Sequence, residues 1–329
     1  MQILSKTHFN FIRWRWHALA LSLLVLGAGI ATIVARGGVP LGIDFSGGTI
    51  VVVQFDQPKT EQDVLNALAG VPVEKTVVRY GPADRNEFQI RLPQHIAEEQ
   101  GTNLEQGARP IGGALEQTDL GTYRVQSTDI VGPIVGEELK RKGIYATLTA
   151  LIGIMIYIAL RFRFTFAVGA IVATLHDILI TLVFLVWFGY DLSLNIIAAI
   201  LTITGYSVND TIVVFDRVRE NLRSQRRDRL EEVVNTSVND TLSRTVITAG
   251  TTFLAVFGLY LFGGEVLEGF AFTMLVGIAA GTYSTIFIAS AIAIVLSSRK
   301  AGKSRAGAQA AAATGKTPAR TRRGRRAGA

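Results

Sequence analysis

An aspartate lies inside an otherwise apolar segment of the chain. Asp210 stands in the run VNDTIVVFDRVREN, residues 208–221, six residues before the charged boundary at Asp216 and Arg217. In a helix this separation is roughly 9 Å, which places the acid inside any membrane that the helix crosses. A carboxylate in hydrocarbon is costly, so such acids face protein or water and commonly bind or move an ion. We expect the function to depend on this helix.

Two neighbours could share proton transfer with Asp210. One is Asn209, which belongs to a polar stripe that we expect to face protein or water. The stripe consists of Asn195, Thr202, Tyr206, Asn209, Val213 and Asp216. The other is Arg244, which could reach lipid phosphates or turn inward, where ionised Asp210 would hold it and protonated Asp210 would release it. A static structural pair is the alternative, and the sequence leaves both open.

A second pair of ionisable groups lies near the middle of another apolar segment. His176 and Asp177 are adjacent, thirteen and fourteen residues past Arg163. Neighbours on a helix point about 100° apart, so the two side chains cannot face one partner equally. A proton relay is one interpretation, and hydrogen bonding between packed helices is the other, especially for His176. A buried acid still requires a partner or a role, so both remain candidates for a proton pathway.

The residues that the chain lacks limit the remaining chemistry. It has no cysteine and only four histidines, and no nucleophile–base set or metal-ligand cluster occurs. Gly302-Lys303-Ser304 resembles the end of a phosphate loop, but Ser297 stands where the earlier glycine is required. We therefore predict a protein that is not an enzyme and has no cofactor or metal. The predicted coupling ion is the proton, although the sequence does not distinguish it from sodium.

Composition indicates a membrane protein. Of 329 residues, 49% are hydrophobic and 18% are charged, whereas soluble domains contain about 25% charged residues. An apolar window of about 17 residues or more can cross about 30 Å of hydrocarbon. We predict six spans, at residues 18–35, 144–160, 164–188, 192–215, 246–262 and 270–296.

Basic residues predict the orientation of these spans. The chain has 33 Lys and Arg residues. Of these, 22 lie in four segments: residues 1–17, the loop between the second and third spans, loop 217–245 and tail 297–329. The other 11 lie in segment 36–143, which also contains 15 acidic residues. Because cytoplasmic segments are rich in Lys and Arg, we expect both termini inside and segment 36–143 outside. Residues 230–243 should form a polar helix on the membrane surface. The tail should be disordered and bind anionic lipid, with no specific nucleic acid.

Segment 36–143 alternates between apolar and polar residues, which is typical of a small α+β domain. The predicted order is β-α-β-β-α-β. Strands are expected at residues 49–55, 73–80, 87–92 and 123–131, with helices beginning after Thr60 and spanning 94–117. Thr60 and Asp63 have the spacing of a capping box at the start of the first helix. This order predicts a ferredoxin-like sheet with its helices on one face.

Glycine-containing segments connect this domain to the spans. GIDFSGGT, residues 42–49, follows the first span, and GPIVGEELKRK, residues 132–142, leads into the second. Their glycines permit turns or close backbone approaches that a side chain would block. Asp44 and Ser46 could be a catalytic pair, but no histidine follows nearby and a structural elbow is favoured. The candidate hinge residues are Gly42, Asp44, Gly47, Gly48, Gly132 and Pro133.

Several motifs occur together in the order found in a known family. They are GIDFSGGT after the first span, VGPIVGEELKRKG before the second, LHD in the third, GYSVNDTIVVFDRVREN closing the fourth, SRT opening the fifth and FGGEVLEGF before the sixth. In these motifs, over about residues 9–298, the chain resembles the SecF proteins of the SecD/SecF family, relatives of the RND transporters. The resemblance implies a multi-pass protein of the bacterial inner membrane, with an α+β domain in the periplasm between helices 1 and 2.

The resemblance also implies partners and residue roles. A SecF protein would form a complex with SecD, assist the SecYEG translocon, with YajC and YidC as further candidates, and act on unfolded preprotein. It would use the proton-motive force to drive late steps of translocation. By motif position, Asp210 matches the family's span-four aspartate implicated in proton flow, and Arg244 matches the span-five arginine implicated with it. The alternative functions are a half-size RND-type exporter and a structural assembly subunit.

Overall fold

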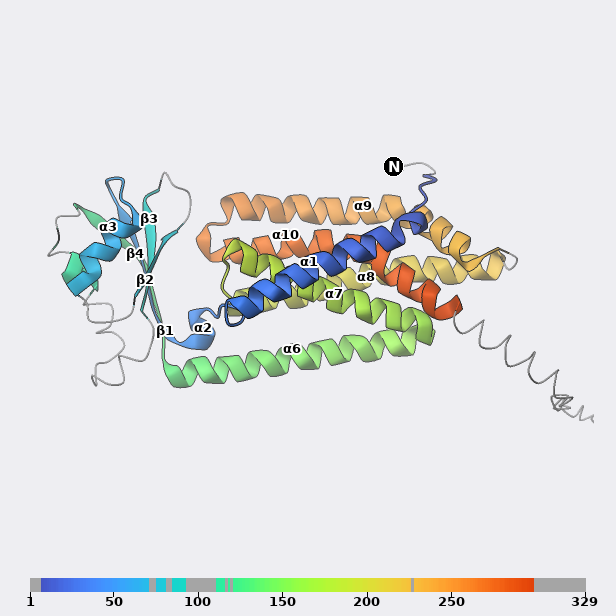
Figure 1. Ribbon diagram of the computed structural model, residues 1–329, viewed down its shortest axis with the longest axis horizontal. Helices are drawn as coiled ribbons and strands as arrows, with labels where there is room; N and C mark the ends of the chain where they lie inside the picture. The colour runs from blue at the N-terminus through green and yellow to red at the C-terminus, as the bar shows by residue number, and fades with distance from the viewer. Residues whose placement is uncertain are drawn as a thin grey trace, which may run out of the picture.

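The computed structural model describes residues 7–70, 75–80, 85–92, 111–115, 118, 121–225 and 228–298. These residues form a bundle of long helices and a small four-stranded sheet beyond one end of the bundle (Figure 1). The predicted fold class, a polytopic helical membrane protein with an inserted α+β domain, is confirmed. Most of the predicted helix 94–117 and nearly all of the basic tail lie outside the described residues.

Six helices are long and apolar enough to cross a membrane, as predicted. They are α1 (Arg15–Ala35), α6 (Pro133–Arg161), α7 (Phe164–Phe188), α8 (Leu194–Ser224), α9 (Leu230–Phe262) and α10 (Glu265–Ser284). A short 3₁₀ turn, η1 (Ile12–Trp14), precedes α1. The last span continues from α10 through a π-helical turn, η3 (Thr285–Ala289), to Ser298.

Three helices extend well beyond their apolar windows. α6 already begins at Pro133, α8 continues to Ser224, and α9 begins at Leu230. Residues 230–243, for which we predicted a polar helix, are helical and form the first turns of α9. Apolar composition marks only the part of a helix that lipid can surround, whereas an amphipathic stripe carries the helix further. In α9 that buried stripe includes Val233, Val234, Val238 and Leu242.

The inserted domain has the predicted ferredoxin-like topology. Its strands are β1 (Gly48–Phe55), β2 (Thr76–Tyr80), β3 (Glu87–Leu92) and β4 (Tyr123–Val131). They lie in the order β2-β3-β1-β4, and every neighbouring pair is antiparallel. Helix α3 (Glu61–Ala67) and the turn η2 (Leu68–Gly70) connect β1 to β2. The capping box between Thr60 and Asp63 is present, as predicted.

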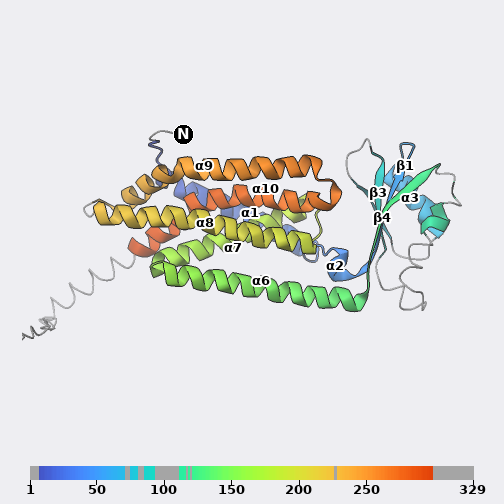
Figure 2. The same ribbon diagram turned by 180° about the vertical axis from the view of Figure 1, so that it is seen from behind.

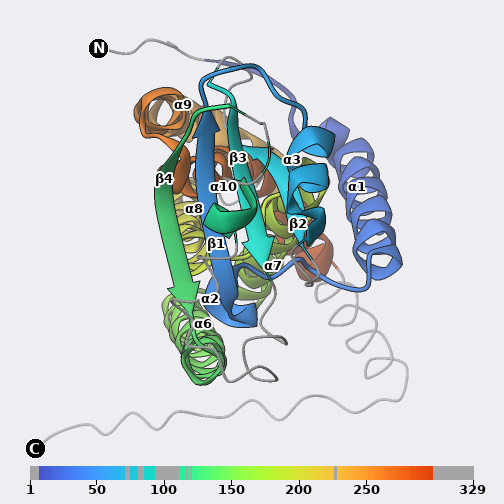
Figure 3. The ribbon, with the colours of Figure 1, turned by 90° about the vertical axis from the view of Figure 1, so that its left-hand side faces the viewer.

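Side-chain alternation along β1 gives the sheet two buried faces. Val51, Val53 and Phe55 pack with Phe88 and Ile90 of β3 and with Val64 and Leu68 beneath α3. Ile50 and Val52 point to the opposite face, where they meet Ile43 near the beginning of the first connector. Figure 3 shows α3 on one side of the sheet and α6 running back from below β4. One strand therefore holds together the domain core and the connector.

The bundle has a tightly packed interior around α7, α8 and the last span (Figure 2). Close helix approach depends on small residues. A Cβ added at Gly277 of α10 would lie 2.3 Å from Ile203 of α8, and one added at Gly281 would lie 2.9 Å from Ser207. A Cβ at Gly169 of α7 would lie 2.7 Å from the carbonyl oxygen of Ala289 in η3. This last contact is with backbone, which cannot move aside as a side-chain tip can.

We therefore expect Gly169→Ala to destabilise the bundle. Overpacking of this kind costs about 1–3 kcal/mol, so the thermal unfolding midpoint of the purified protein in detergent should fall. Gly153→Ala in α6 is the control, because a Cβ there would meet nothing within 4 Å. Equal midpoints for the two variants would contradict the packing that η3 and α7 show.

Candidate functional site

Asp210 lies between α8 and α9 and is only partly satisfied. Its Oδ1 accepts a hydrogen bond of 2.7 Å from the Thr245 hydroxyl on α9. Its Oδ2 is buried and has no hydrogen-bond partner among the described residues. Tyr206, one turn earlier on α8, also has a buried hydroxyl without a partner in that part of the chain. Buried polar atoms are nearly always paired, so this pair of atoms marks a polar site that is open to a further partner.

Arg244 does not form an ion pair with Asp210 in this structure. Its side chain is exposed, and the residue that contacts the acid is its neighbour, Thr245. No salt bridge of Arg244 occurs within the described ranges. Asp210 therefore accepts a hydrogen bond from a neutral hydroxyl group, that of Thr245, while the cationic Arg244 is the preceding residue on α9. The expected Asp210–Arg244 contact would therefore require another conformation of the Arg244 side chain or another arrangement of α8 and α9.

The described residues of the chain leave the polar stripe of α8 largely uncovered. Asn195, Thr202 and Asn209, which are seven residues apart, are exposed, and Tyr206 and Asp210 beside them are partly buried. Thr248 and Thr251 of α9 are exposed next to this face. Such a stripe is costly in contact with lipid tails, because its polar groups would have no partners there. Within the described residues, the face that contains the site is therefore open.

Asp177 has a different environment, because both of its carboxylate oxygens are paired. The residue is 1% exposed. Oδ1 lies 3.0 Å from Nδ1 of His176, and Oδ2 accepts hydrogen bonds from Ser207 of α8 at 2.6 Å and Ser284 of α10 at 2.7 Å. A carboxylate with several donors is well stabilised even in a low-dielectric interior. Asp177 thus connects α7, α8 and α10.

His176 extends this network to α1. Its Nε2 lies 3.1 Å from the Ser22 hydroxyl, which donates to the Tyr283 hydroxyl at 3.2 Å. Tyr283 in turn donates to the Ala18 carbonyl at 2.7 Å. His176 and Asp177 point to different partners, as their angular separation on a helix predicts. Their common network includes four of the six spans.

The two acidic centres are joined through α8 and the last span. Ser207, a partner of Asp177, lies one turn before Asp210 and Thr211 on α8. The Thr211 hydroxyl is 2.8 Å from the hydroxyl of Thr285, the first residue of η3. A π-helical turn inside a helix is rare and often marks a functional position. Movement of α8 at Asp210 would therefore act on the Asp177 network and on η3 together.

Sequence reasoning located both acids but missed their partners. The hydroxyl groups that bind them belong to Thr245, Ser207 and Ser284, and the network continues through Ser22 and Tyr283. Single Ser and Thr residues are common in membrane helices, where they often bond to their own backbone. The available signal was the coincidence of hydroxyl residues with small residues, as at Gly281 opposite Ser207.

The first connector contacts the beginning of α8. Residues Ile43–Ser46 form one helical turn, α2, whose Asp44 carboxylate accepts a 2.8 Å hydrogen bond from the backbone N–H of Leu194. Leu194 is the first residue of α8, where free N–H groups and the helix dipole favour a negative charge. Asp44 therefore caps the same helix that contains Asp210.

Glycines allow the connector to approach its neighbours closely. The Gly42 N–H donates to the Leu192 carbonyl at 2.8 Å, and a Cβ at Gly42 would lie 3.0 Å from that oxygen. Gly47 and Gly48 have φ values of +69° and +120°, which other residues rarely adopt. A Cβ at Gly136 of α6 would lie 3.2 Å from the Gly47 nitrogen.

The second connector is an abrupt helix start. Gly132, in an extended conformation, is the N-cap residue of α6, and Pro133 follows at the first helical position, where no backbone N–H donor is needed.

The sheet is also attached to the bundle by an ion pair between Arg91 of β3 and Asp191, which precedes α8. Both links to the sheet, through Asp44 and through Asp191, thus converge on the start of α8.

Comparison with known proteins identifies relatives of the whole chain. Residues 112–299 match the family described as protein export membrane protein SecD/SecF, C-terminal, and residues 34–59 match the SecD/SecF GG motif. A protein of Desulfurispirillum indicum named protein translocase subunit SecF is 41% identical over 292 residues, which are 87% of this chain and 91% of that protein. A protein of the same name from Escherichia coli O157:H7 is 38% identical, with 89% of each chain covered.

Solved structures give the same relationship. The chain is similar to a crystal structure of SecDF from Thermus, described as a translocon-associated membrane protein, with a TM-score of 0.78 at 33% identity. That match covers 89% of this chain and 39% of the solved chain. A second SecDF structure, in a super-membrane-facing form, has a TM-score of 0.67 at 36% identity and covers 92% and 41%. The chain therefore spans less than half the length of either solved chain.

The geometry predicts that Asp177 contributes strongly to stability. Asp177→Ala would leave the Ser207 and Ser284 hydroxyls buried without their acceptor, and each lost bond to a charged group costs about 1.5–3 kcal/mol. We expect a large fall in the thermal unfolding midpoint of the purified protein. Asp216→Ala, which removes a partly exposed ion pair with Arg161, should cause a small one. If the two variants unfold at the same temperature, the network does not stabilise the bundle.

Proposed function

The chain belongs to the SecD/SecF family of protein-export membrane proteins as a SecF translocase subunit, and we propose that it couples proton binding at Asp210 to late steps of preprotein export across the bacterial inner membrane. The observation that carries this proposal is the half-satisfied state of Asp210, with one oxygen on Thr245 and the other buried without a described partner. An acid in that state gains or loses a partner whenever it changes protonation. It is thus suited to act as a switch.

The contrast with Asp177 supports the choice of Asp210. Asp177 has donors on both oxygens and connects four spans through His176 and the neighbouring hydroxyl groups. Changing its protonation would disturb the centre of the bundle, so we assign it and His176 the role of a fixed polar core beside the pathway. Asn209 and Arg244 lie exposed at the edge of the pathway, where they can meet water or another subunit.

The proposed switch has two arrangements. Ionised Asp210 accepts from Thr245 and attracts the guanidinium of Arg244; protonated Asp210 no longer holds the cation, and α8 and α9 are free to shift. Each charge that crosses 100 mV of membrane potential releases about 2.3 kcal/mol. A few protons per cycle therefore supply enough free energy to move a domain on a hinge.

The uncovered polar stripe of α8 supports a second subunit at this site. We propose that SecD covers Asn195, Thr202 and Asn209 and supplies the polar partner that Asp210 Oδ2 lacks among the described residues. The assembly would then work beside SecYEG on unfolded preprotein, with both termini of this chain in the cytoplasm and the sheet in the periplasm. YajC and YidC are further candidate partners.

The coupling route runs along α8. Asp44 bonds the first residue of that helix, and α2 continues directly into β1 at the centre of the sheet. A shift of α8 at Asp210 would thus be transmitted to the sheet through α2 alone. The sheet could then hold emerging polypeptide and oppose its return.

One observation favours a competing function, in which the chain is a structural subunit that holds a complex together. The Asp177 network would hold four of the six spans together whether or not protons move, and a scaffold subunit needs no more than that. A half-size RND-type exporter is the other alternative. Such a protein would move small molecules, so its activity would not depend on a preprotein.

Asp210→Asn tests the switch. We expect export driven by an imposed pH gradient to fall to the background level in inverted vesicles, while the variant still assembles with SecD, because Asn retains the Thr245 contact but cannot titrate. Asp216→Asn, on the same helix near the membrane boundary, is the matched control and should remain active. Normal gradient-dependent export by assembled Asp210→Asn would reject the proposal. A sodium gradient imposed alone identifies the ion.

Asp44→Ala tests the coupling route. Loss of an acceptor at a helix start costs about 0.5–2 kcal/mol, and here it also removes the side-chain bond between α2 and α8. We expect a broader distribution of distances between spin labels on β4 and on α9, together with weaker gradient-driven export. Asp44→Asn, which keeps an acceptor oxygen, should restore part of both. Asp56→Ala changes an exposed acid of the same domain and is the control. An unchanged distance distribution in Asp44→Ala would exclude this route.

A further inference from the structure

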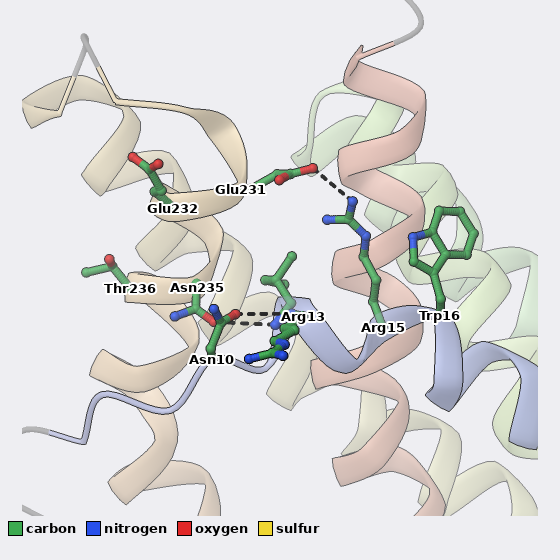
Figure 4. A pocket seen from close by; sticks show the side chains of 9 residues that line it. Asn10, Arg13, Arg15, Trp16, Glu231, Glu232, Asn235 and Thr236 are labelled. Carbon is green, nitrogen blue, oxygen red and sulfur yellow. Dashed lines mark hydrogen bonds and ion pairs between the residues drawn. The ribbon is translucent and has the colours of Figure 1, made fainter.

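A polar cavity of about 450 Å³ lies where η1 and the start of α1 meet the first turns of α9, at the end of the bundle far from the sheet (Figures 1 and 4). Its polar lining includes Arg13, Arg15, Trp16, Glu231, Glu232 and Thr236. A volume of this size suits a small ligand or the headgroup of a lipid. The coupling site at Asp210 uses none of these residues.

Hydrogen bonds fix the wall of this cavity. The carboxamide of Asn239 on α9 accepts from the Phe9 N–H at 2.9 Å and donates to the Phe9 carbonyl at 2.8 Å. Asn235 donates to the same carbonyl at 3.0 Å and accepts from the Ile12 N–H at 3.4 Å. The segment before α1 is therefore held on α9 by side chains that contact its backbone. A binding site with fixed walls loses little entropy when a ligand enters.

Charges of both signs line the cavity, and several are unused. Arg15 forms a 2.9 Å ion pair with Glu231, but its Nε is buried without a partner among the described residues. The side chains of Arg13 and Glu232 make no ion pair or hydrogen bond in that part of the chain. Figure 4 shows Glu232 on α9 and Arg13 and Arg15 on the facing segment. The lining thus includes an exposed guanidinium, that of Arg13, and an exposed carboxylate on α9, that of Glu232, and neither has a partner among the described residues.

The charges select the ligand. A simple anion would be attracted by the arginines but repelled by Glu232, and a simple cation would be repelled by the arginines. A zwitterion satisfies both sides. The location favours a lipid, because the exposed Trp14 and Trp16, at 61% and 58%, mark the membrane interface beside the cavity.

We propose that this cavity binds the headgroup of phosphatidylethanolamine, a membrane lipid with a primary ammonium group beside its phosphate. The phosphate lies toward Arg13 and the part of the Arg15 guanidinium that remains exposed, and the ammonium group donates hydrogen bonds to Glu232. The primary ammonium is required, because the quaternary ammonium of phosphatidylcholine has no N–H to donate. Phosphatidylglycerol has the phosphate but no cation for Glu232. The lipid would join α1 to α9 at the end of the bundle.

The test compares lipids with identical acyl chains on the purified full-length protein. Phosphatidylethanolamine should raise the thermal unfolding midpoint more than phosphatidylcholine or phosphatidylglycerol, and native mass spectrometry should retain one molecule of it per chain. Water-soluble glycerophosphoethanolamine should compete only weakly. Equal stabilisation by all three lipids would overturn the proposal, as would preference for phosphatidylglycerol, which indicates attraction to the arginines alone. Equal binding of the soluble headgroup would replace the lipid by a soluble ligand and also overturn it.

Variants assign the two halves of the headgroup. Glu232→Gln should remove the advantage of phosphatidylethanolamine over phosphatidylcholine, whereas Arg13→Gln should weaken retention of both, because both contain the phosphate. The matched controls Asp228→Asn and Arg223→Gln change exposed charges outside the cavity lining and should leave the lipid order unchanged. If Glu232→Gln keeps the wild-type lipid preference, the ammonium group is not bound there. The comparison of lipids on the unaltered protein decides the question even if a variant does not fold.

Discussion

A carboxylate inside a membrane must find hydrogen-bond donors within protein or water, and this requirement shapes the centre of the bundle. Two aspartates lie within the apolar helices, and their hydrogen-bond partners differ. Asp177 has donors on both oxygens, so it can be held as a permanent part of the packed interior. Asp210 has a described donor on only one oxygen and stands beside an uncovered polar face. The first arrangement provides a fixed reference within the bundle, and the second provides a group whose partners can change.

The connection to the sheet follows from the same requirement that buried polar groups find hydrogen-bond partners. The start of α8 needs acceptors for its free N–H groups, and Asp44 supplies one from the connector that leads into β1. The positive-φ residues Gly47 and Gly48 let this connector turn close to α6, and Gly42 bonds the backbone of Leu192, just before α8. The helix with the incompletely paired acid is thereby attached to β1, an inner strand of the inserted domain. Separate elements for sensing and for movement are not required.

The fold was largely predictable because its signals are local. Apolar windows predicted six spans, and the predicted strand bounds 87–92 and 123–131 were correct. The spacing of Thr60 and Asp63 predicted the start of the first helix of the domain. Helix lengths were not predictable from apolarity, since α9 extends from Leu230 through a polar first third that packs by one stripe. The acids were visible in the sequence because charge is rare in hydrocarbon. Their partners were not, because Ser207, Thr245 and Ser284 meet them only through helix packing.

The central claim is that Asp210 exchanges a proton while Asp177 keeps its state. Infrared difference spectroscopy on isotope-labelled aspartate, recorded on the complex in membranes as the external pH is stepped, observes carboxyl groups directly. The account predicts a protonated-carboxyl band that responds to the pH step, disappears in Asp210→Asn and persists in Asp216→Asn. A spectrum in which the responding band survives Asp210→Asn, or in which no carboxyl band responds, would contradict it.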